Sequence, residues 1–584
     1  MLALAALLGG ASCRRDVMSG LPKQPPPDAG STVNEATSEA PIEPPIADAA
    51  QWASFADADY LMLGNRAWLP ALAPLIAHRN AHGHRVAAIA IEDVYARLSN
   101  GAPDADALHG AIERLVAHTA GKLKFVLLAG DTAPPPEEGL SPLPTFYLQK
   151  LDYEHHKAGE HFLLGEHNHE EVVHTNQTYP SDRPFSIVAA SKTKGLGVEP
   201  TRLAVGRIPA RSKAQLRAFA DKLVTYETSA PEGAWQRTLA VTAGPANYGP
   251  VVDGVIEGLA NKLFDRDVSY DFDLRFTFAK LQSPYAYRFD QLQQKFVDDL
   301  DRGALIATYV GHGAASSFDD VYFHGKWYPI GDDHDAARVV IPTGQPLFFS
   351  FACDTGAFDR PDGKASLAEA LILNEKGAIG VFASSRESHP YPNALYGQAV
   401  IAQFVNGRPA TIGEGVLAME AQVQGASIAG ASLLIDTDED ALKEEHFGLY
   451  NLLGDPATRL RYPSAAGVVV TPLPSGKLSV AITASVPNAG TATVTLETKR
   501  STIRGTLTPP STLESMTTDA AFAAMAKNYA LASDKVVATK EIAFQKGLGT
   551  GELAMPKAPG DYVIKVLLRG DGGVAIGHAD LKVP

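Results

Sequence analysis

The chain of 584 residues contains only two cysteines, Cys13 and Cys353. This number excludes a fold held together by disulfides and a zinc site built from several thiolates. Basic residues are also in short supply, because 51 Lys and Arg stand against 66 Asp and Glu. The resulting net charge of −15 gives no general attraction to nucleic acid.

Long apolar runs are absent as well. Beyond the first residues, no segment reaches the roughly 18 to 20 consecutive apolar residues that a membrane-spanning helix needs. The composition is nevertheless that of a folded protein, with 45% apolar and 20% charged residues. The length corresponds to about four domains if roughly 150 residues form one.

Residues 1–13 have the pattern of an export signal. An apolar run, Leu2–Leu8, is followed by small residues and then by Cys13. A cysteine at this place resembles a bacterial lipobox, in which the thiol is acylated, although no basic residue precedes the run and Gly10 stands where Leu is usual. We expect an exported protein of the cell envelope, attached to the membrane only through a lipid on Cys13. An ordinary cleaved signal and an extracellular protein are the alternative.

Residues 14–57 are rich in Pro, Ala, Ser, Glu and Thr, including the run Pro25–Pro27. Such a composition buries little apolar surface, so we expect a disordered linker over the whole segment.

The middle of the chain alternates between apolar strands and amphipathic helices. Strands without polar alternation, separated by helices, predict an α/β fold with a parallel sheet covered on both faces. Ligands of such sheets bind beyond the carboxyl ends of the strands. Two of these ends carry reactive side chains: Ala304–Val310 leads into His312, and Leu347–Ala352 leads into Cys353.

An imidazole beside a thiol is a chemically competent pair. The thiol, with an ordinary pKa of about 8.5, needs a base to become a nucleophile, and His312 can supply it if the two strands are neighbours. The backbone N–H groups of Gly313 and Cys353 are candidates for an oxyanion hole. The alternative is a small buried cysteine with a packing role only.

Several segments that occur in order make the chain similar to the gingipain family, within the caspase-like clan of cysteine peptidases. They are Val126–Asp131, Leu203–Pro209, Tyr309–Gly313, Phe351–Cys353, Ala378–Ser384, Thr411–Glu414 and Leu453–Pro456. The resemblance implies a caspase-like sheet in two subdomains, residues 58–228 and 229–463. It also implies a cysteine-type endopeptidase with His312 as general base and acid and Cys353 as nucleophile.

The resemblance implies less about the substrate pocket. Some members of the family have a glutamate near the histidine, whereas Thr242–Pro245 contains no acid at the matching place. Arginine-specific members place a carboxylate in the pocket, and the nearest acid here is Asp253, offset by about a residue. Further candidates are Asp354, Ser384 and Ser385, although Asp253 is also explained as an exposed acid near a helix start.

One segment departs from the family. It is dense in imidazoles and glutamates, and the histidines are His155, His156, His161, His167, His169 and His174. Such side chains bind zinc, but no fixed ligand spacing is visible, so a solvated loop is the alternative. No cofactor is expected to be required, and calcium or zinc is expected at most as a structural ion.

Residues 464–584 change to alternating strands separated by Gly, Pro and Asn turns, with a helical insertion near residues 519–532. This pattern predicts an antiparallel β-sandwich, and the resemblance implies an immunoglobulin-like domain. The sequence as a whole therefore predicts an exported cysteine endopeptidase that acts on protein or peptide substrates through a thioester acyl-enzyme. The alternatives are an inactive surface protein with a binding or adhesion role, and a metal-binding surface protein.

Overall fold

The computed structural model describes residues 43–133, 140–151, 178–188, 201–245, 266–428 and 438–584. Cys13, Asp253 and the six histidines of the His-rich segment lie outside these residues. The predictions that concern them stay predictions.

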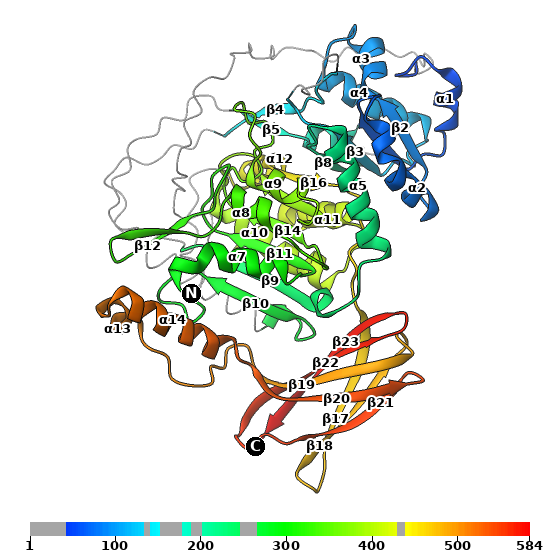
Figure 1. The fold of residues 1–584 in the computed structure, drawn as a ribbon. Helices are drawn as coiled ribbons and strands as arrows, with labels where there is room; N and C mark the ends of the chain where they lie inside the picture. The colour runs from blue at the N-terminus through cyan, green and yellow to red at the C-terminus, as the bar shows by residue number, and fades with distance from the viewer. Residues whose placement is uncertain (1–42, 134–139, 152–177, 189–200, 246–265, 429–437) are drawn as a thin grey trace.

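A ten-stranded sheet forms the centre of the molecule (Figure 1). Its strands, in spatial order, are β10 (Asp273–Phe278), β9 (Thr238–Ala243), β11 (Ile306–Val310), β14 (Leu347–Phe351), β15 (Gly380–Ser384), β16 (Tyr450–Gly454), β8 (Ala204–Ile208), β3 (Phe125–Ala129), β1 (Tyr60–Gly64) and β2 (Val86–Ala90). The five strands from β10 to β15 are parallel to their neighbours, and so are the four strands from β8 to β2. The prediction of an α/β fold around a large parallel sheet is confirmed for these nine strands.

Strand β16 departs from the prediction. It pairs antiparallel with β15 along its whole length and contacts β8 through the pair Leu453 and Arg207. It comes from the end of the α/β unit and lies between the strands of the two predicted subdomains. One sheet therefore runs without a break across the predicted boundary at residue 229.

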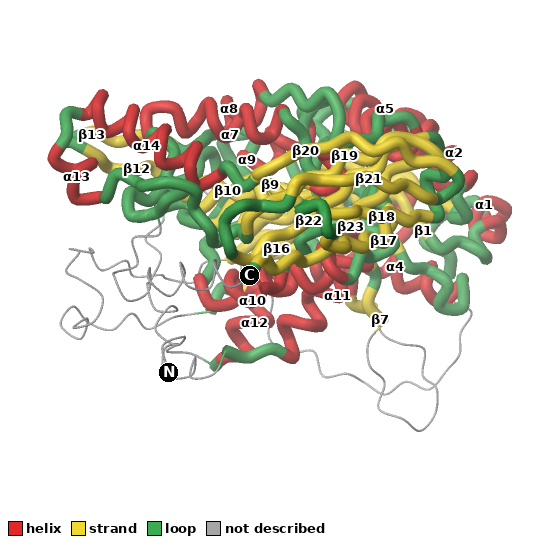
Figure 2. Tube along the Cα trace, turned by 90° about the horizontal axis from the view of Figure 1, so that it is seen from below, coloured by secondary structure: helices red, strands yellow, loops and turns green. Residues whose placement is uncertain are grey.

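Helices cover both faces of the sheet (Figure 2). One face carries α5 (Lys213–Thr228), α7 (Leu292–Asp301), α8 (Asp333–Arg338) and α9 (Leu367–Leu373), and the other carries α10 (Pro390–Val400), α11 (Ile412–Gly425) and α12 (Glu439–Leu449). Around the first strands lie η1 (Leu69–Leu72), α2 (Ala73–Ala81), α3 (Ile91–Leu98) and α4 (Ala105–His118). Because both faces are covered, β1, β3, β14 and β15 are buried at every residue, which explains their continuous apolar sequences.

The linker prediction is wrong at its C-terminal end. Helix α1 (Ala49–Ser54) begins at Asp48, whose carboxylate accepts hydrogen bonds from the backbone N–H groups of Ala50 and Gln51. Ile46, Trp52 and Phe55 are buried in the core formed with β1 and α4. These apolar side chains indicated a folded segment, but the average composition of residues 14–57 did not show it.

Two hairpins extend from the sheet. The first pairs β4 (Phe146–Gln149) with β5 (Thr178–Ser181), and the second pairs β12 (Asp320–Phe323) with β13 (Lys326–Pro329). The second hairpin follows the end of β11 directly in the chain, so it is a continuation of the turn that carries His312.

Seven strands after residue 463 form a closed barrel with its own apolar core (Figure 1). They are β17 (Ser464–Pro472), β18 (Lys477–Ala484), β19 (Ala489–Thr498), β20 (Val536–Gln545), β21 (Leu548–Ala554), β22 (Gly560–Gly570) and β23 (Gly573–Val583). All pairs are antiparallel except β17 with β23, whose parallel contact closes the barrel. The predicted helical insertion is present as α13 (Pro510–Ser515) and α14 (Thr518–Ser533).

Within the described part of the chain, no helix has both the length and the apolar character that crossing a membrane requires.

Candidate active site

Cys353 lies immediately beyond the carboxyl end of β14. The strand is buried at every residue, and Cys353 itself is 3% exposed. The next residue, Asp354, has a φ of 58°, a left-handed conformation that turns the chain sharply away from the sheet. The thiol therefore lies at the edge of the sheet where ligands of parallel α/β proteins bind.

The sulfur has two contacts with one residue of a neighbouring loop. The backbone N–H of Ser388 donates to Sγ at 3.4 Å, and Sγ lies 3.7 Å from the carbonyl oxygen of Ser388. The amide can therefore bind a thiolate, and the carbonyl can accept from a thiol, so one residue contacts the sulfur in both protonation states.

His312 lies in the turn after β11, which is the parallel neighbour of β14 with Val310 opposite Phe351. The condition that these two strands are neighbours, on which the pairing of imidazole and thiol depends, is therefore met. Gly313 packs so closely on the nucleophile's turn that a Cβ there would lie 2.9 Å from Cβ of Ala352 and 3.0 Å from the carbonyl oxygen of Cys353. The absence of a side chain at Gly313 is what lets the two turns meet.

Tyr309, in strand β11, fixes the backbone of the turn that carries His312. Its hydroxyl donates to the carbonyl oxygen of His312 at 2.9 Å, and its ring stacks on Phe318 with centroids 3.6 Å apart. Gly244, after β9, packs against the same hydroxyl, and an added Cβ there would lie 2.8 Å from it. The imidazole is partly exposed, whereas the backbone that carries it is fixed on the sheet side.

Ser384 and Ser385, at the end of β15, have no exposed surface. The Ser384 hydroxyl donates to the carbonyl oxygen of Arg386 at 2.7 Å, and the Ser385 hydroxyl donates to that of Pro180 at 2.8 Å. The same Arg386 carbonyl accepts from the N–H of Asp354 at 3.1 Å. Both serines act here as supports of the loop beside Cys353 rather than as lining of an open cleft.

Charged side chains surround the nucleophile's turn. The Arg386 guanidinium binds both carboxylate oxygens of Asp359, at 2.8 and 2.7 Å. Burial raises the pKa of Asp354 to about 6, Arg386 opposes this shift, and Glu387 adds to it. The carboxyl group of Asp354, the residue after Cys353, is therefore a weaker acid than an ordinary aspartate.

Lys150 directly follows strand β4 and approaches the site from the first hairpin. Its ammonium group donates to Glu387 at 2.8 Å and is 6% exposed. Burial alone would lower the pKa of Lys150, but the carboxylates of Glu387 and Glu445 and the nearby Cys353 sulfur raise it above its ordinary value. Sequence reasoning missed Lys150 and Ser388, because neither has a local motif and both contact the site through the fold.

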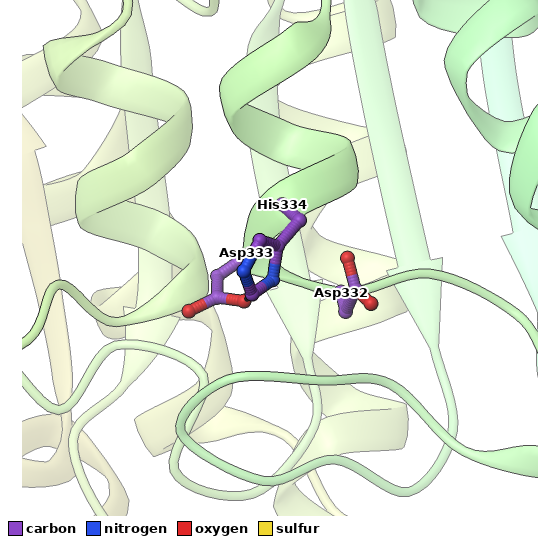
Figure 3. Close-up of side chains that lie close together, drawn as sticks. All are labelled: Asp332, Asp333 and His334. Atoms are coloured by element: carbon purple, nitrogen blue, oxygen red, sulfur yellow. Dashed lines mark ion pairs between the residues drawn. The ribbon is translucent and has the colours of Figure 1, made fainter.

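Three potential cation ligands lie together at the start of α8, beside the segment that follows the His312 turn. The ligand atoms of Asp332, Asp333 and His334 lie within 4.8 Å of one another (Figure 3). Asp332 is the N-cap of α8 and accepts from the N–H of Asp335 at 2.8 Å, and Asp333 lies 2.9 Å from the His334 imidazole. Helix capping and a local pair explain these side chains without an ion.

A thiol and an imidazole on adjacent strand ends of a two-sided α/β sheet are the groups a cysteine peptidase uses, and comparison with known proteins assigns the chain to that class. More specifically, residues 53–461 match the model of Peptidase family C25. This match covers well over half of the chain, so the chain belongs to peptidase family C25.

One solved structure agrees with this assignment at the level of the fold. The Arg-specific cysteine proteinase gingipain R is 14% identical, with a TM-score of 0.50, and the match covers 91% of this chain and 98% of that one. A complex of Porphyromonas gingivalis RgpB pro- and mature domains is 15% identical, with a TM-score of 0.45, and the match covers 90% of this chain and all of that one. No curated protein sequence matches the chain.

Proposed function

We propose that the protein is an exported cysteine endopeptidase in which Cys353 is the nucleophile and His312 is the general base and acid. The observation that carries this proposal is the packing of Gly313 directly on the backbone of Cys353, which joins the two reactive turns. Membership of peptidase family C25 supports protein or peptide substrates.

The chemistry follows from these positions. His312 takes the thiol proton, and the sulfur of Cys353 attacks the carbonyl carbon of the scissile peptide bond. The tetrahedral intermediate collapses to a thioester as the C–N bond breaks, and His312 gives its proton to the leaving amine. Water, deprotonated by His312, then attacks the thioester, which releases the carboxylate product and returns the proton to the thiol.

Three backbone N–H groups and one ammonium group assist this cycle. The backbone N–H groups of Gly313 and Cys353 bind the oxyanion of the tetrahedral intermediate. The Ser388 N–H stabilises negative charge on the sulfur before attack, and the Lys150 ammonium adds to this stabilisation. Neither effect requires a metal or a cofactor, and a calcium or zinc ion, if bound, would have a structural role.

We propose that the enzyme prefers substrates with a cationic side chain before the scissile bond. Asp354 and Asp253 are the proposed carboxylates of the primary pocket, and a carboxylate there favours a cationic substrate residue. Cleavage of a library of fluorogenic peptides that varies the residue before the scissile bond tests this assignment. Equal cleavage after Arg, Lys, Leu and Glu would contradict it.

Export through the signal in residues 1–13, acylation of Cys13 and an immunoglobulin-like identity of the C-terminal barrel belong to the same proposal. The apolar run before Cys13 supports export and acylation. The seven-stranded barrel with its own core supports the immunoglobulin-like identity. Mass spectrometry of the mature N-terminus tests the acylation, since a free or absent Cys13 would contradict it.

The central experiment labels the protein with a peptidyl acyloxymethyl ketone, which alkylates the active thiol of cysteine peptidases. We expect labelling of the wild type, none of Cys353→Ala, and greatly slowed labelling of His312→Ala. A wild type that stays unlabelled under reducing conditions, after limited proteolysis to remove any propeptide, would overturn the enzyme assignment. That result would favour the inactive surface protein, and zinc retained on dialysis but lost on deletion of residues 154–174 would favour the metal-binding protein.

A further inference from the structure

The loop that contacts the nucleophile is itself anchored at a buried histidine. Ser388 touches the sulfur of Cys353, and the next residue, His389, donates its backbone N–H to Nε2 of His446 at 2.6 Å. His446 belongs to α12 and has no exposed surface. A continuous chain of contacts thus runs from the core of the molecule to the thiol.

The two ring nitrogens of His446 have fixed roles. Nδ1 lies 2.8 Å from the carbonyl oxygen of Leu442, which only accepts hydrogen bonds, so the ring proton must be on Nδ1. Nε2 faces an N–H group, which only donates, so Nε2 must carry a lone pair. The imidazole is therefore neutral and in a single tautomer, and its acceptor nitrogen points at the nucleophile's loop.

The surroundings of the ring agree with a neutral state. Burial above all, with smaller electrostatic effects of His389 and Lys150, lowers the pKa of His446 to about 3, against the raising effect of the Leu442 carbonyl. The carboxylate of Glu445 lies 3.9 Å from Nδ1, but Glu445 also accepts from the N–H of Leu151 at 2.7 Å. The acceptor nitrogen thus persists over the pH range in which peptidases work.

Other contacts fix the neighbouring parts of the loop. The His389 side chain accepts from the N–H of Tyr391 and caps α10. The Ser388 hydroxyl accepts from the amide of Asn393 at 2.9 Å, and the Tyr450 hydroxyl lies 3.4 Å from it. His446 is the side chain that holds the backbone between these two anchors.

We propose that His446 is a positioning residue for the nucleophile: its Nε2 holds the His389 amide and thereby keeps Ser388 against the sulfur of Cys353. This inference rests on the proposed role of Cys353 as nucleophile. If the anchor is lost, the partly buried N–H of His389 loses its acceptor on His446, and the loop moves to find another. The sulfur then loses the amide that stabilises its negative charge, which slows attack more than it weakens substrate binding.

Two substitutions separate positioning from simple core packing. In His446→Gln the side-chain oxygen reaches the place of Nε2 and can still accept from His389. In His446→Asn the side-chain amide reaches only the place of Nδ1, so the bond to Leu442 is kept and the bond to His389 is lost. Asn is one methylene group smaller than Gln, so the stability of both variants is needed to tell a packing loss from a positioning loss.

We expect His446→Asn to lower kcat about tenfold, equivalent to about 1.4 kcal/mol, with KM changed less than twofold. The rate of Cys353 alkylation by iodoacetamide should fall in parallel, and His446→Gln should keep both rates within about threefold of the wild type. Equal losses in the two variants, or a change confined to KM, would overturn the proposal. Melting temperatures of both variants, measured alongside, identify a loss that comes from unfolding.

The proposed function and this inference fail in different ways. If the wild type cleaves no peptide and is not labelled at Cys353, the enzyme assignment itself fails. If the wild type is active and His446→Asn is as active as His446→Gln, only the positioning role of His446 fails.

Discussion

Cys353 is held between two backbone segments that arrive from different strands, Gly313 on one side and Ser388 on the other. Neither contact depends on a long side chain. The position of the thiol is therefore set by main-chain atoms, whose freedom is limited by the buried strands on which they end. Small changes in backbone position at these two residues should affect reactivity more than stability.

Gly313→Ala tests the first contact. The new methyl group would lie 2.9 Å from both Cβ of Ala352 and Cγ2 of Thr355, so the His312 turn has to move away from the nucleophile. We expect kcat/KM to fall about a hundredfold and the free energy of unfolding to fall by about 1–3 kcal/mol. Peptide hydrolysis and urea unfolding measure the two effects.

Gly397→Ala is the matched control, because a Cβ at this helical position meets nothing within 4 Å. It should leave activity unchanged and raise stability slightly, by up to about 1 kcal/mol. Full activity of Gly313→Ala would show that the close approach of the turns is not needed.

Asp354 gives the site a pH dependence of stability. Its pKa is raised by burial from 3.8 to about 6, so between these two pH values the folded protein binds more protons than the unfolded chain. The contribution of protonated Asp354 to the free energy of unfolding is therefore lost as the pH rises from about 4 to about 6. Asp354→Asn should stabilise the protein by about 1–3 kcal/mol at pH 8 and by nothing at pH 3.5, as measured by urea unfolding at both pH values. The same gain at both would contradict this account.

At the scale of elements, the helical insertion of the barrel packs on the hairpin that follows His312. Phe522 of α14 is 3% exposed and contacts Phe323 and Tyr328 of the hairpin, with ring centroids 5.7 and 5.4 Å apart. The imidazole of His324, at the hairpin turn, lies 3.1 Å from the Thr518 hydroxyl. Figure 1 shows α13 and α14 extending from the barrel to this place.

Phe522→Ala removes this support. We expect the free energy of unfolding to fall by about 3–5 kcal/mol and kcat to fall several-fold even below the melting temperature, because the hairpin and the His312 turn are continuous. Tyr322→Ala, on the outer face of the same hairpin and 57% exposed, should change stability by no more than about 0.5 kcal/mol. Equal effects of the two substitutions on kcat would show that α14 does not support the turn.

The elements differ in how well the sequence predicted them. Strands β11 and β14 were predicted within two residues because both are mainly apolar runs, β14 being buried at every residue and β11 at three of its five. Strand β10 was missed, since Asp273 and Arg275 give it the charged residues of a surface segment. The anchors Ser388 and His446 could not be predicted, because their contacts join residues far apart in the chain and leave no local pattern.

At the scale of the molecule, the barrel covers an edge of the sheet. Lys565 of β22 is 3% exposed and binds Asp273, at the start of the edge strand β10, and Arg237 binds the same carboxylate at 2.7 Å. The Arg500 guanidinium donates to the carbonyl oxygens of Val268 and Phe272 at 2.7 and 2.9 Å. A covered edge is protected from pairing with other chains.

Lys565→Met tests this interface. Burial of Asp273 with one cation instead of two should lower the free energy of unfolding by about 1–3 kcal/mol and separate the unfolding of the barrel from that of the sheet. Lys582→Met, at an exposed position of β23, is the control and should change it by no more than about 0.5 kcal/mol. Differential scanning calorimetry distinguishes one transition from two, and a single unchanged transition in Lys565→Met would contradict the expected coupling.

The place of β16 determines the order in which the sheet is completed during synthesis. Strand β8 leaves the ribosome early, yet its open edge meets β16 only after every strand from β9 to β15 has been made. The nascent N-terminal half therefore presents an unpaired strand edge while residues 209–454 are being made, the situation in which chaperones are needed and aggregation competes. Neither half of the sheet is a finished folding unit until Gly454 has emerged.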